Sequence, residues 1–226
     1  MNDVKQLVII GAGAQGCDIL WTVNDCNKQS KKFNVIGFLD ENKSIHNTSI
    51  NNIKILGDFN WFFENDVRNY FFVIGIGDGK IREKIVKKLE KHNLNFCSII
   101  HPSVIYAESV SIGNGTVIQA GVKIAPNCKI GDHVLINLNS IIGHDTILKD
   151  YVTISPTSVI NGESLIELGT YIGSASVIQD TITIGKWSVI GIGSIVNQNI
   201  PAYSVYVNPN GRVIKNIEDE SKRPKL

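Results

Sequence analysis

The hexads that begin at Ile112 decide the fold: residues 112–147 read IGNGTV, IQAGVK, IAPNCK, IGDHVL, INLNSI and IGHDTI. An aliphatic residue opens every hexad as far as Ile190, and a small or β-branched residue follows four positions later. A period of six fits neither the 3.6-residue helical face nor simple strand alternation. It fits short strands joined by corners, with each aliphatic side chain pointing into a narrow coil.

One hexad cannot bury its own aliphatic residue, so the repeats must stack in coils about 4.8 Å apart that are joined by backbone hydrogen bonds. We therefore expect a rigid parallel β-solenoid. The recurring aliphatic positions are Ile112, Ile118, Ile124, Ile130, Ile136, Ile142, Leu148, Ile154, Ile160, Ile166, Ile172, Ile178, Ile184 and Ile190.

The N-terminal region has a different pattern. Residues 4–10 form a short apolar run that predicts a buried parallel strand. The loop Gly11-Ala12-Gly13-Ala14-Gln15-Gly16 follows at once, and the apolar spacing of residues 17–23 predicts a helix. Strand, glycine loop and helix are the context in which G-x-G-x-x-G indicates nucleotide binding, because free amides at the helix start favour an anion.

Further strands are predicted downstream of this loop. Residues 34–40 predict a strand that ends on Asp40, where such folds usually hold a ribose or a base. Residues 70–77 predict a third strand with its own glycine pair, residues 81–89 an amphipathic helix, and residues 95–100 a fourth strand. The region is too short for two complete mononucleotide halves, so we expect it to bind one nucleotide and not a dinucleotide.

The predicted domain boundary lies near residue 101, because Pro102 cannot continue a central ladder. We expect a Rossmann-like nucleotide-sugar-binding domain over residues 1–101. A β-helix domain with a packed tail should cover residues 102–217. The charged residues 218–226 are expected to form a disordered tail.

Composition argues against several classes of protein. The chain has 226 residues, with 22 lysines and arginines against 21 aspartates and glutamates. Because these charges nearly balance, no broad electrostatic field attracts the protein to nucleic acid or to an anionic membrane. It shows no signal peptide and no run of about eighteen apolar residues, so we expect a cytoplasmic protein without membrane insertion. The four cysteines, which lack metal-ligand spacing and are expected as reduced thiols, are Cys17, Cys26, Cys97 and Cys128. We expect no bound metal.

The hexads match the signature [LIV]-[GAED]-x-x-[STAV]-x, and local motifs add to it. These motifs are residues 9–16, residues 37–41, residues 75–78 with Arg82, residues 100–102 and residues 137–145. Nearly the whole chain thereby resembles the sialic acid O-acetyltransferase and bacillosamine-pathway N-acetyltransferase family. The resemblance implies a left-handed β-helix with three hexads per coil, acetyl-CoA as co-substrate, a homotrimer, and a role in polysaccharide biosynthesis.

The candidate catalytic residues are His144 and Asp145. Acyl transfer from a thioester needs a base that removes the acceptor proton, and histidine suits this because its pKa lies near neutrality. His144 with Asp145 matches the catalytic histidine and adjacent acid of the family, and the acid would fix the tautomer and stabilise the imidazolium. The other histidines, for which we expect surface or structural positions, are His46, His92, His101 and His133.

The resemblance also assigns the binding residues. Those expected to contact the nucleotide sugar are Gly11, Gly13, Ala14, Gln15, Gly16, Asp40, Glu41, Gly77, Asp78, Arg82 and Asn137. Those expected at acetyl-CoA are Ser155, Gly173, Gly191 and Pro209. Backbone amides near Ser155 and Gly173 should hold the thioester oxyanion. Trp187 should face outward, at a subunit contact or along the CoA groove.

The leading prediction is an acetyl-CoA-dependent N-acetyltransferase acting on a UDP- or dTDP-linked amino sugar. No serine or cysteine lies in a nucleophile motif, so direct attack by the amine is the simpler mechanism. The alternatives are an O-acetyltransferase acting on a sialic acid or a related sugar, and a non-catalytic solenoid scaffold. A γ-type carbonic anhydrase needs three zinc histidines, and His133 and His144 do not have that spacing.

Overall fold

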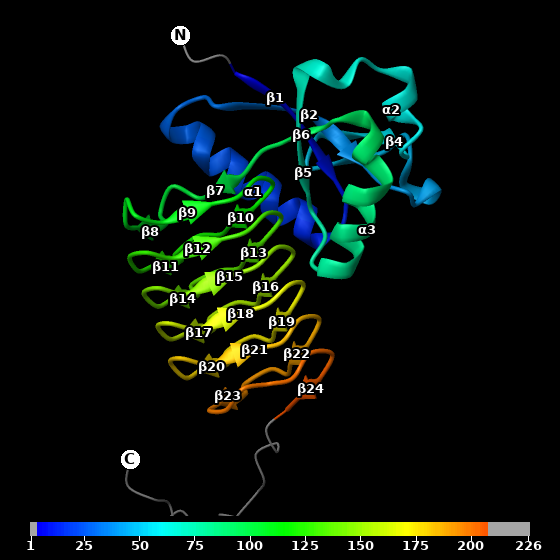
Figure 1. Cartoon of the computed structure of the whole chain (residues 1–226). Helices are drawn as coiled ribbons and strands as arrows, with labels where there is room; N and C mark the ends of the chain where they lie inside the picture. The colour runs from blue at the N-terminus through cyan, green and yellow to red at the C-terminus, as the bar shows by residue number, and fades with distance from the viewer. Residues whose placement is uncertain (1–3, 208–226) are drawn as a thin grey trace, which may run out of the picture.

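The computed structural model describes residues 4–207. An N-terminal α/β domain rests against one side of a β-solenoid whose coils continue to the C-terminal end of the described chain (Figure 1). Pro209, one of the predicted acetyl-CoA residues, lies outside the described residues, as does most of the predicted tail. Within residues 4–207, no helix combines the length and the apolar character that crossing a membrane requires.

The N-terminal domain is a six-stranded sheet with helices on both faces. Its strands are ordered β3-β4-β2-β1-β5-β6, and all neighbours are parallel except β3 and β4. The elements are β1 (Lys5–Ile10), α1 (Ala14–Gln29), β2 (Phe33–Leu39), β3 (Ser49–Ile50), β4 (Ile53–Gly57), α2 (Trp61–Glu64), β5 (Tyr70–Ile74), α3 (Gly79–Leu89) and β6 (Asn95–Phe96), with 3₁₀ turns at Lys43–Ile45, Val67–Asn69 and Glu90–His92.

Two predicted elements differ from the structure for local reasons. The helix expected over residues 81–89 begins at Gly79, because Asp78 Oδ1 accepts hydrogen bonds from the amides of Lys80 and Ile81. The strand expected over residues 95–100 is two strands. Its first part, β6, pairs with β5, whereas β7 (Ile99–Ile100) pairs with β10 of the solenoid. The chain therefore enters the solenoid at Ile99, two residues before the predicted boundary.

The hexads form three parallel sheets, as predicted. Sheet I contains β7, β10 (Val117–Ile118), β13 (Leu135–Ile136), β16 (Thr153–Ile154), β19 (Tyr171–Ile172), β22 (Val189–Ile190) and β24 (Val205–Tyr206). Sheet II contains β8 (Ile105–Tyr106), β11 (Lys123–Ile124), β14 (Ile141–Ile142), β17 (Val159–Ile160), β20 (Val177–Ile178) and β23 (Ile195–Val196). Sheet III contains β9 (Ser111–Ile112), β12 (Lys129–Ile130), β15 (Ile147–Leu148), β18 (Leu165–Ile166) and β21 (Thr183–Ile184).

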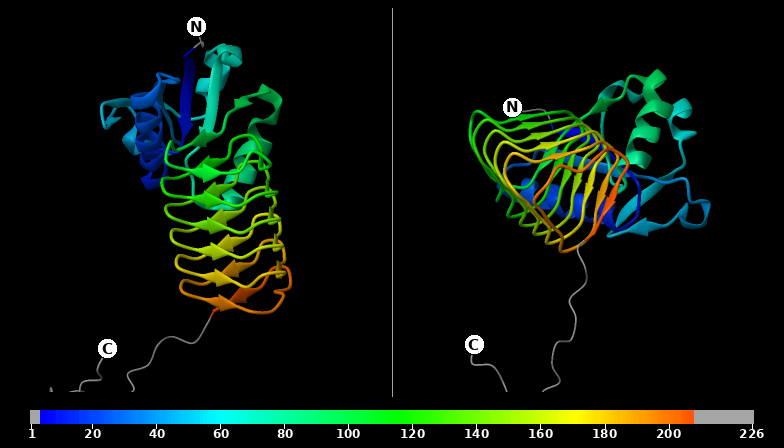
Figure 2. Two further views of the ribbon diagram at one scale, coloured as in Figure 1. Left: turned by 90° about the vertical axis from the view of Figure 1, so that its left-hand side faces the viewer. Right: turned by 60° about the horizontal axis from the view of Figure 1, so that its bottom comes forward.

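One coil takes eighteen residues, so Val117 pairs with Leu135, which pairs with Thr153. Figure 2 shows the stacked coils from two further directions. The aliphatic residues that open the hexads from Ile118 onward point inward and are buried. The small position of each hexad is buried too. Where it carries a hydroxyl, this usually donates within the solenoid: Ser140 Oγ donates to the Ser155 carbonyl and Ser158 Oγ to the Gly173 carbonyl, whereas Ser194 Oγ has no partner among the described residues. Many repeat units therefore combine an aliphatic core residue with an internal hydrogen bond.

The solenoid has three corners, which we name by the sheets they join. Corner I–II leads from sheet I to sheet II, as at residues 137–140. Corner II–III leads from sheet II to sheet III, as at residues 143–146, and corner III–I, as at residues 149–152, closes the coil. Figure 1 shows α1 and α3 against the sheet I side, where Val117 and Leu135 pack with Ile19 and Val23 of α1. Corner II–III is thus the corner that does not border the covered sheet.

Candidate active site

His144 lies in corner II–III, between β14 and β15, with more than half of its side chain exposed. Its Nδ1 is 2.8 Å from Asp145 Oδ2. The backbone at Asp145 is left-handed, with φ of 58°, a conformation that aspartate tolerates better than most residues. Its amide donates to the Pro126 carbonyl at 3.0 Å, so the coil above fixes the turn that carries both side chains.

The hydrogen bonds to Asp145 determine which imidazole nitrogen is free. The bond with His144, and next the bond from Asn127 Nδ2 at 3.1 Å, lower the pKa of the Asp145 carboxyl. An ionised carboxylate only accepts hydrogen bonds, so His144 Nδ1 must carry the proton. The unprotonated nitrogen is then Nε2, which is the arrangement a general base needs.

Two residues that support this pair were missed at the sequence level. Asn127 holds the second carboxylate oxygen of Asp145, and Gly162 makes room for the ring, because a β-carbon there would lie 2.7 Å from His144 Nε2. Both stand eighteen residues from the residue they contact. The coil period was the signal that could have identified them.

The glycine loop of residues 11–16 follows β1 and leads into α1, as predicted. Gly11 has φ of 103°, and a β-carbon on it would lie 2.8 Å from the Gly75 carbonyl oxygen; one on Gly16 would collide with the Gly11 carbonyl. At Gly13 a β-carbon would meet no atom within 4 Å. The start of α1 has neither a side-chain cap nor an acidic residue in its first turn, so its amides remain available to an anion.

Asp40 and Glu41 lie beyond the end of β2, where they line a cavity of about 230 Å³ together with Gly11 and Phe59. Asp40 Oδ2 accepts from the Ala12 amide at 2.8 Å, so this carboxylate also shapes the glycine loop. Glu41 Oε1 accepts from the Phe59 amide at 3.1 Å. A role for either residue in nucleotide binding stays a prediction.

Three other predicted sugar-binding residues lie in this loop or in the second glycine pair. Ala14 is exposed at the first position of α1. Gln15 follows it with Nε2 buried, and within the described residues this atom has no hydrogen-bond partner. Gly77 follows β5 as part of the second glycine pair, and a β-carbon there would meet no atom within 4 Å.

Arg82 does not have the role predicted from the sequence. It is buried, and its guanidinium donates from Nε to the His133 carbonyl, from Nη1 to the carbonyls of Ile76 and Gly77, and from Nη2 to Tyr151, Val152 and Thr153. Burial lowers its pKa to about 10. All of its donor groups are engaged within the chain, so Arg82 joins the two domains and offers nothing to a substrate.

The predicted acetyl-CoA residues Ser155, Gly173 and Gly191 are stacked in corner I–II below Asn137. Their backbone amides donate to Ile172, Ile190 and Tyr206 of the next coil, so these amides cannot supply the oxyanion donors expected near Ser155 and Gly173. Asn137 Nδ2 also donates within the solenoid, to the Ile154 carbonyl. The next residues, Ser174 and Ile192, carry amides that donate to no protein group among residues 4–207.

The remaining histidines have structural or surface positions. His101 links α1 to the first coil, with Nε2 3.1 Å from Asp25 Oδ2 and Nδ1 2.8 Å from Ser103 Oγ. His133 is buried under the N-terminal domain, and burial lowers its pKa to about 4. The other two are near the outside of the N-terminal domain, at His46 and His92.

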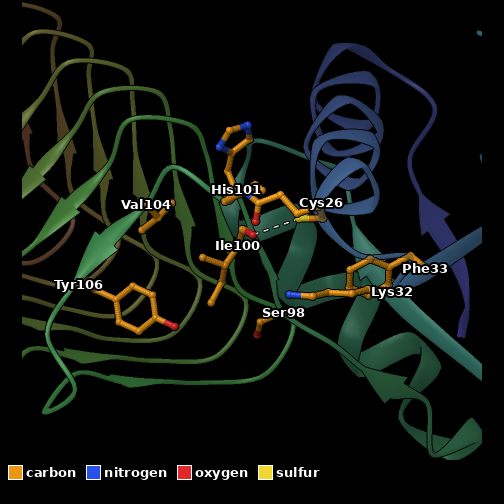
Figure 3. Close-up of a pocket in the computed structure, with 10 residues that line it drawn as sticks. Cys26, Lys32, Phe33, Ser98, Ile100, His101, Val104 and Tyr106 are labelled. Carbon is orange, nitrogen blue, oxygen red and sulfur yellow. Dashed lines mark hydrogen bonds between the residues drawn. The ribbon is translucent and has the colours of Figure 1, made fainter. Parts of the chain in front are cut away.

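A cavity of about 410 Å³ separates the end of α1 from the first solenoid coil (Figure 3). Figure 3 shows His101 and Cys26 on one side, Tyr106 on the other, and the hydrogen bond of 3.2 Å from Cys26 Sγ to the Ile100 carbonyl. None of the predicted site residues lines this cavity. We therefore place the candidate site elsewhere.

Comparison with known protein families matches a segment of each domain. Residues 6–89 match the PglD N-terminal domain, and residues 109–137 match the bacterial transferase hexapeptide with six repeats. The chain is 30% identical to GDP-perosamine N-acetyltransferase of Escherichia coli O157:H7 over 135 residues. This aligned segment makes up 59% of this chain and 60% of that protein. It is also 35% identical to UDP-N-acetylbacillosamine N-acetyltransferase of Bacillus subtilis strain 168 over 54 residues, an aligned segment that makes up 24% of this chain and 25% of that protein.

Solved structures share the fold over almost the whole length. Perosamine N-acetyltransferase from Caulobacter crescentus, solved with CoA and GDP-perosamine, superposes with a TM-score of 0.82 at 22% identity, over 91% of this chain and 95% of that chain. The acetyltransferase domain of PglB from Neisseria gonorrhoeae FA1090, solved with acetyl coenzyme A, gives a TM-score of 0.83 at 20% identity, over 91% of this chain and 97% of that chain. At these identities the likeness establishes the fold, including the order of the two domains.

Proposed function

The chain belongs to the family in which a PglD N-terminal domain precedes bacterial transferase hexapeptide repeats, and from this premise we propose that it transfers the acetyl group of acetyl-CoA to the amino group of a nucleotide-linked amino sugar. The observation that carries the proposal is the His144–Asp145 pair in the open corner II–III. The named relatives, which are N-acetyltransferases, support the reaction class.

In the proposed reaction the lone pair of the sugar amine attacks the thioester carbonyl carbon directly. His144 Nε2 takes the proton that the amine loses, and Asp145 stabilises the imidazolium that results. The tetrahedral intermediate collapses with loss of the CoA thiolate, which receives the proton from His144. The oxyanion would be held by a free corner amide such as that of Ser174, since the amides of Ser155 and Gly173 are engaged.

The glycine loop supports a nucleoside diphosphate as the carrier of the sugar. The uncapped start of α1 offers amides to the diphosphate, and the cavity beside Asp40 and Glu41 suits a base, since its walls are mostly apolar and carry carboxylates at one side. Asp40→Ala should weaken binding of the nucleotide sugar and leave binding of acetyl-CoA unchanged. The identity of the base stays open between the UDP- or dTDP-type predicted from the sequence and the GDP of the perosamine relatives.

We further propose that the site is shared between subunits of a homotrimer. In one chain the N-terminal domain, which carries the glycine loop, packs on sheet I through α1, whereas His144 is in the corner that does not border that sheet. The outward face of sheet II exposes Ile105, Ile141, Val177 and Ile195. Closed cyclic symmetry buries such a face and brings corner II–III of one subunit toward the N-terminal domain of the next.

A thiol-release assay tests the reaction. Acetyl-CoA is incubated with the protein and a panel of UDP-, dTDP- and GDP-linked amino sugars, and each product is identified by mass spectrometry. We expect thiol release with one of the amino sugars and none with the corresponding hydroxy sugar. Acetylation of a hydroxyl in place of the amine would identify an O-acetyltransferase, and no release with any sugar would contradict the proposal.

Mixed oligomers test the shared site separately. Chains carrying His144→Ala and chains carrying Asp40→Ala are dissociated, mixed and reassembled. Each variant alone should be nearly inactive, whereas the mixture should recover activity because some sites combine an intact His144 with an intact Asp40. A mixture no more active than its parts would place both residues in one subunit's site.

A further inference from the structure

The residues stacked below His144 in corner II–III define the space that its free nitrogen faces. Strands β14, β17 and β20 of sheet II pair in register, so the corners that follow them lie one below the other (Figure 1). His144, Gly162 and Asp180 hold the same position in these three corners, eighteen residues apart. Asp180 therefore lies two coils below His144, with a glycine between them.

The backbone repeats from one of these corners to the next. The Glu163 amide donates to the His144 carbonyl at 2.8 Å, and the Thr181 amide donates to the Gly162 carbonyl at 2.9 Å. The next residue of each corner is left-handed, with φ of 58°, 57° and 62° in turn. Because the turns are equivalent, the exposed side chains of His144 and Asp180 leave the solenoid in the same direction.

Gly162 keeps the space between these two side chains open. A β-carbon on it would lie 2.7 Å from both Cε1 and Nε2 of His144, so the imidazole lies over this glycine. The φ of Gly162 is not in the left-handed region, so the backbone does not require glycine there. The Nε2 edge of His144 thus faces Asp180 across roughly one coil spacing of about 4.8 Å.

Both groups that border this space are hydrogen-bond acceptors. His144 Nε2 is the unprotonated nitrogen, because Nδ1 carries the proton toward Asp145. The Asp180 carboxylate accepts and does not donate, and among residues 4–207 it takes part in no salt bridge. Two acceptors therefore face each other with no donor from the described chain between them.

We infer that this space receives the reacting amino group and that Asp180 selects an amine over a hydroxyl, an inference that rests on the proposed function. A neutral primary amine has two N–H bonds and one lone pair. His144 Nε2 accepts from one N–H and Asp180 from the other, and two hydrogen bonds of about 2.9 Å span the gap. The lone pair then points away from both acceptors, toward the thioester carbon.

A sugar hydroxyl matches the same two acceptors poorly. It has a single O–H, which must bond to His144 Nε2 if the imidazole is to act as its base. The oxygen lone pairs then face the Asp180 carboxylate, which has lost water without gaining a donor. Asp180 should therefore favour the amino sugar both by binding the amine and by disfavouring the hydroxyl.

Thiol-release kinetics of Asp180→Ala and Asp180→Asn test this assignment. The ratio kcat/KM is measured with the amino sugar of the panel that gives the fastest thiol release, and with its hydroxy counterpart, which for GDP-perosamine is GDP-rhamnose. Glu163→Gln is the matched control. It removes a negative charge from the coil between His144 and Asp180, at the neighbouring corner position.

We expect kcat/KM for the amino sugar to fall about 10- to 100-fold in Asp180→Ala, the effect of one hydrogen bond to a charged group. The loss should be smaller in Asp180→Asn, because its amide oxygen still accepts. Acetylation of the hydroxy sugar should stay at its wild-type level or rise. The control should match the wild type with both sugars.

Three results would overturn the role of Asp180 while the proposed function stands. Wild-type kinetics in Asp180→Ala would show that the amine does not contact this carboxylate. An equal loss in Glu163→Gln would show that negative charge near the corner is sufficient, and equal losses with amino and hydroxy sugar would show a structural role. If the wild type releases no thiol with any sugar, the proposed function fails and this inference fails with it.

Discussion

Corners III–I and II–III have the same left-handed turn but opposite surroundings. His133 in corner III–I has φ of 53° and Asp145 in corner II–III has φ of 58°. His133 is only 6% exposed, because Phe96 packs edge-on against its ring and Tyr151 stacks on it. The His144 side chain is 59% exposed and is held by a carboxylate. The cover supplied by the N-terminal domain therefore decides whether a corner histidine is structural or available for chemistry.

The largest effect is expected from substituting Arg82, which holds the N-terminal domain against corner III–I, and it should appear as a loss of stability. Arg82→Met removes a donor from six buried or half-buried oxygens, of which only the Gly77 and Val152 carbonyls keep a second donor among the described residues, so we expect the free energy of unfolding to fall by about 3 to 5 kcal/mol. Urea unfolding measures this. The control is Arg68→Met, because the exposed Arg68 side chain pairs, within the described part of the chain, with the nearby Asp66 alone. Similar stability of the two variants would mean that the interdomain hydrogen bonds contribute little.

His133 should make stability depend on pH. Burial first, and the Arg82 guanidinium second, lower its pKa to about 4 from an ordinary 6.5, while Asp132 and Asp150 oppose this shift. The unfolded chain then binds the proton more readily than the folded one. The contribution of neutral His133 to the free energy of unfolding is fully present above pH 6.5 and is lost as the pH falls toward 4.

The expected loss over that window is roughly 3 kcal/mol. His133→Asn, which suits the left-handed backbone, should flatten this part of the curve of unfolding free energy against pH. An unchanged slope in the variant would show that other groups carry the acid sensitivity.

A smaller effect, on turnover, is expected from substituting Asp145 in the exposed corner II–III. In Asp145→Asn the amide still orients the His144 ring but does not stabilise its positive charge, so kcat should fall roughly ten- to hundredfold. Glu163→Gln is the matched control, because Glu163 is the acid at the equivalent position one coil further on, with the same left-handed φ. Equal rates for the two variants would remove the charge of Asp145 from the mechanism.

Repetition explains how much of the fold the sequence predicts. Each hexad repeats the same local rule, so the buried positions from Ile118 to Ile190 and the turn with His144 and Asp145 follow from one period. The same period, extended to eighteen residues, would also have identified Asn127 and Gly162. It would have excluded the amides of Ser155 and Gly173 as well, because a stacked coil uses them in its ladder.

The contacts between the domains could not be predicted in this way. Arg82 and Trp187 have no periodic signal that says what they touch, and their neighbours are fixed only when α3 packs against corner III–I. The short strands β3 and β4 were missed as well, because two to five residues carry too little pattern. Tertiary packing supplies what these segments lack locally.

The turnover of His144→Ala tests the central claim most directly. At saturating acetyl-CoA and nucleotide amino sugar, kcat should fall about 10²- to 10⁴-fold, the usual contribution of a general base. The unfolding midpoint and the affinity for the nucleotide sugar should match the wild type, because the side chain is exposed and, among residues 4–207, its ring forms a hydrogen bond to Asp145 alone. Near-normal turnover of the folded variant would contradict the claim that the open corner of the solenoid carries the chemistry.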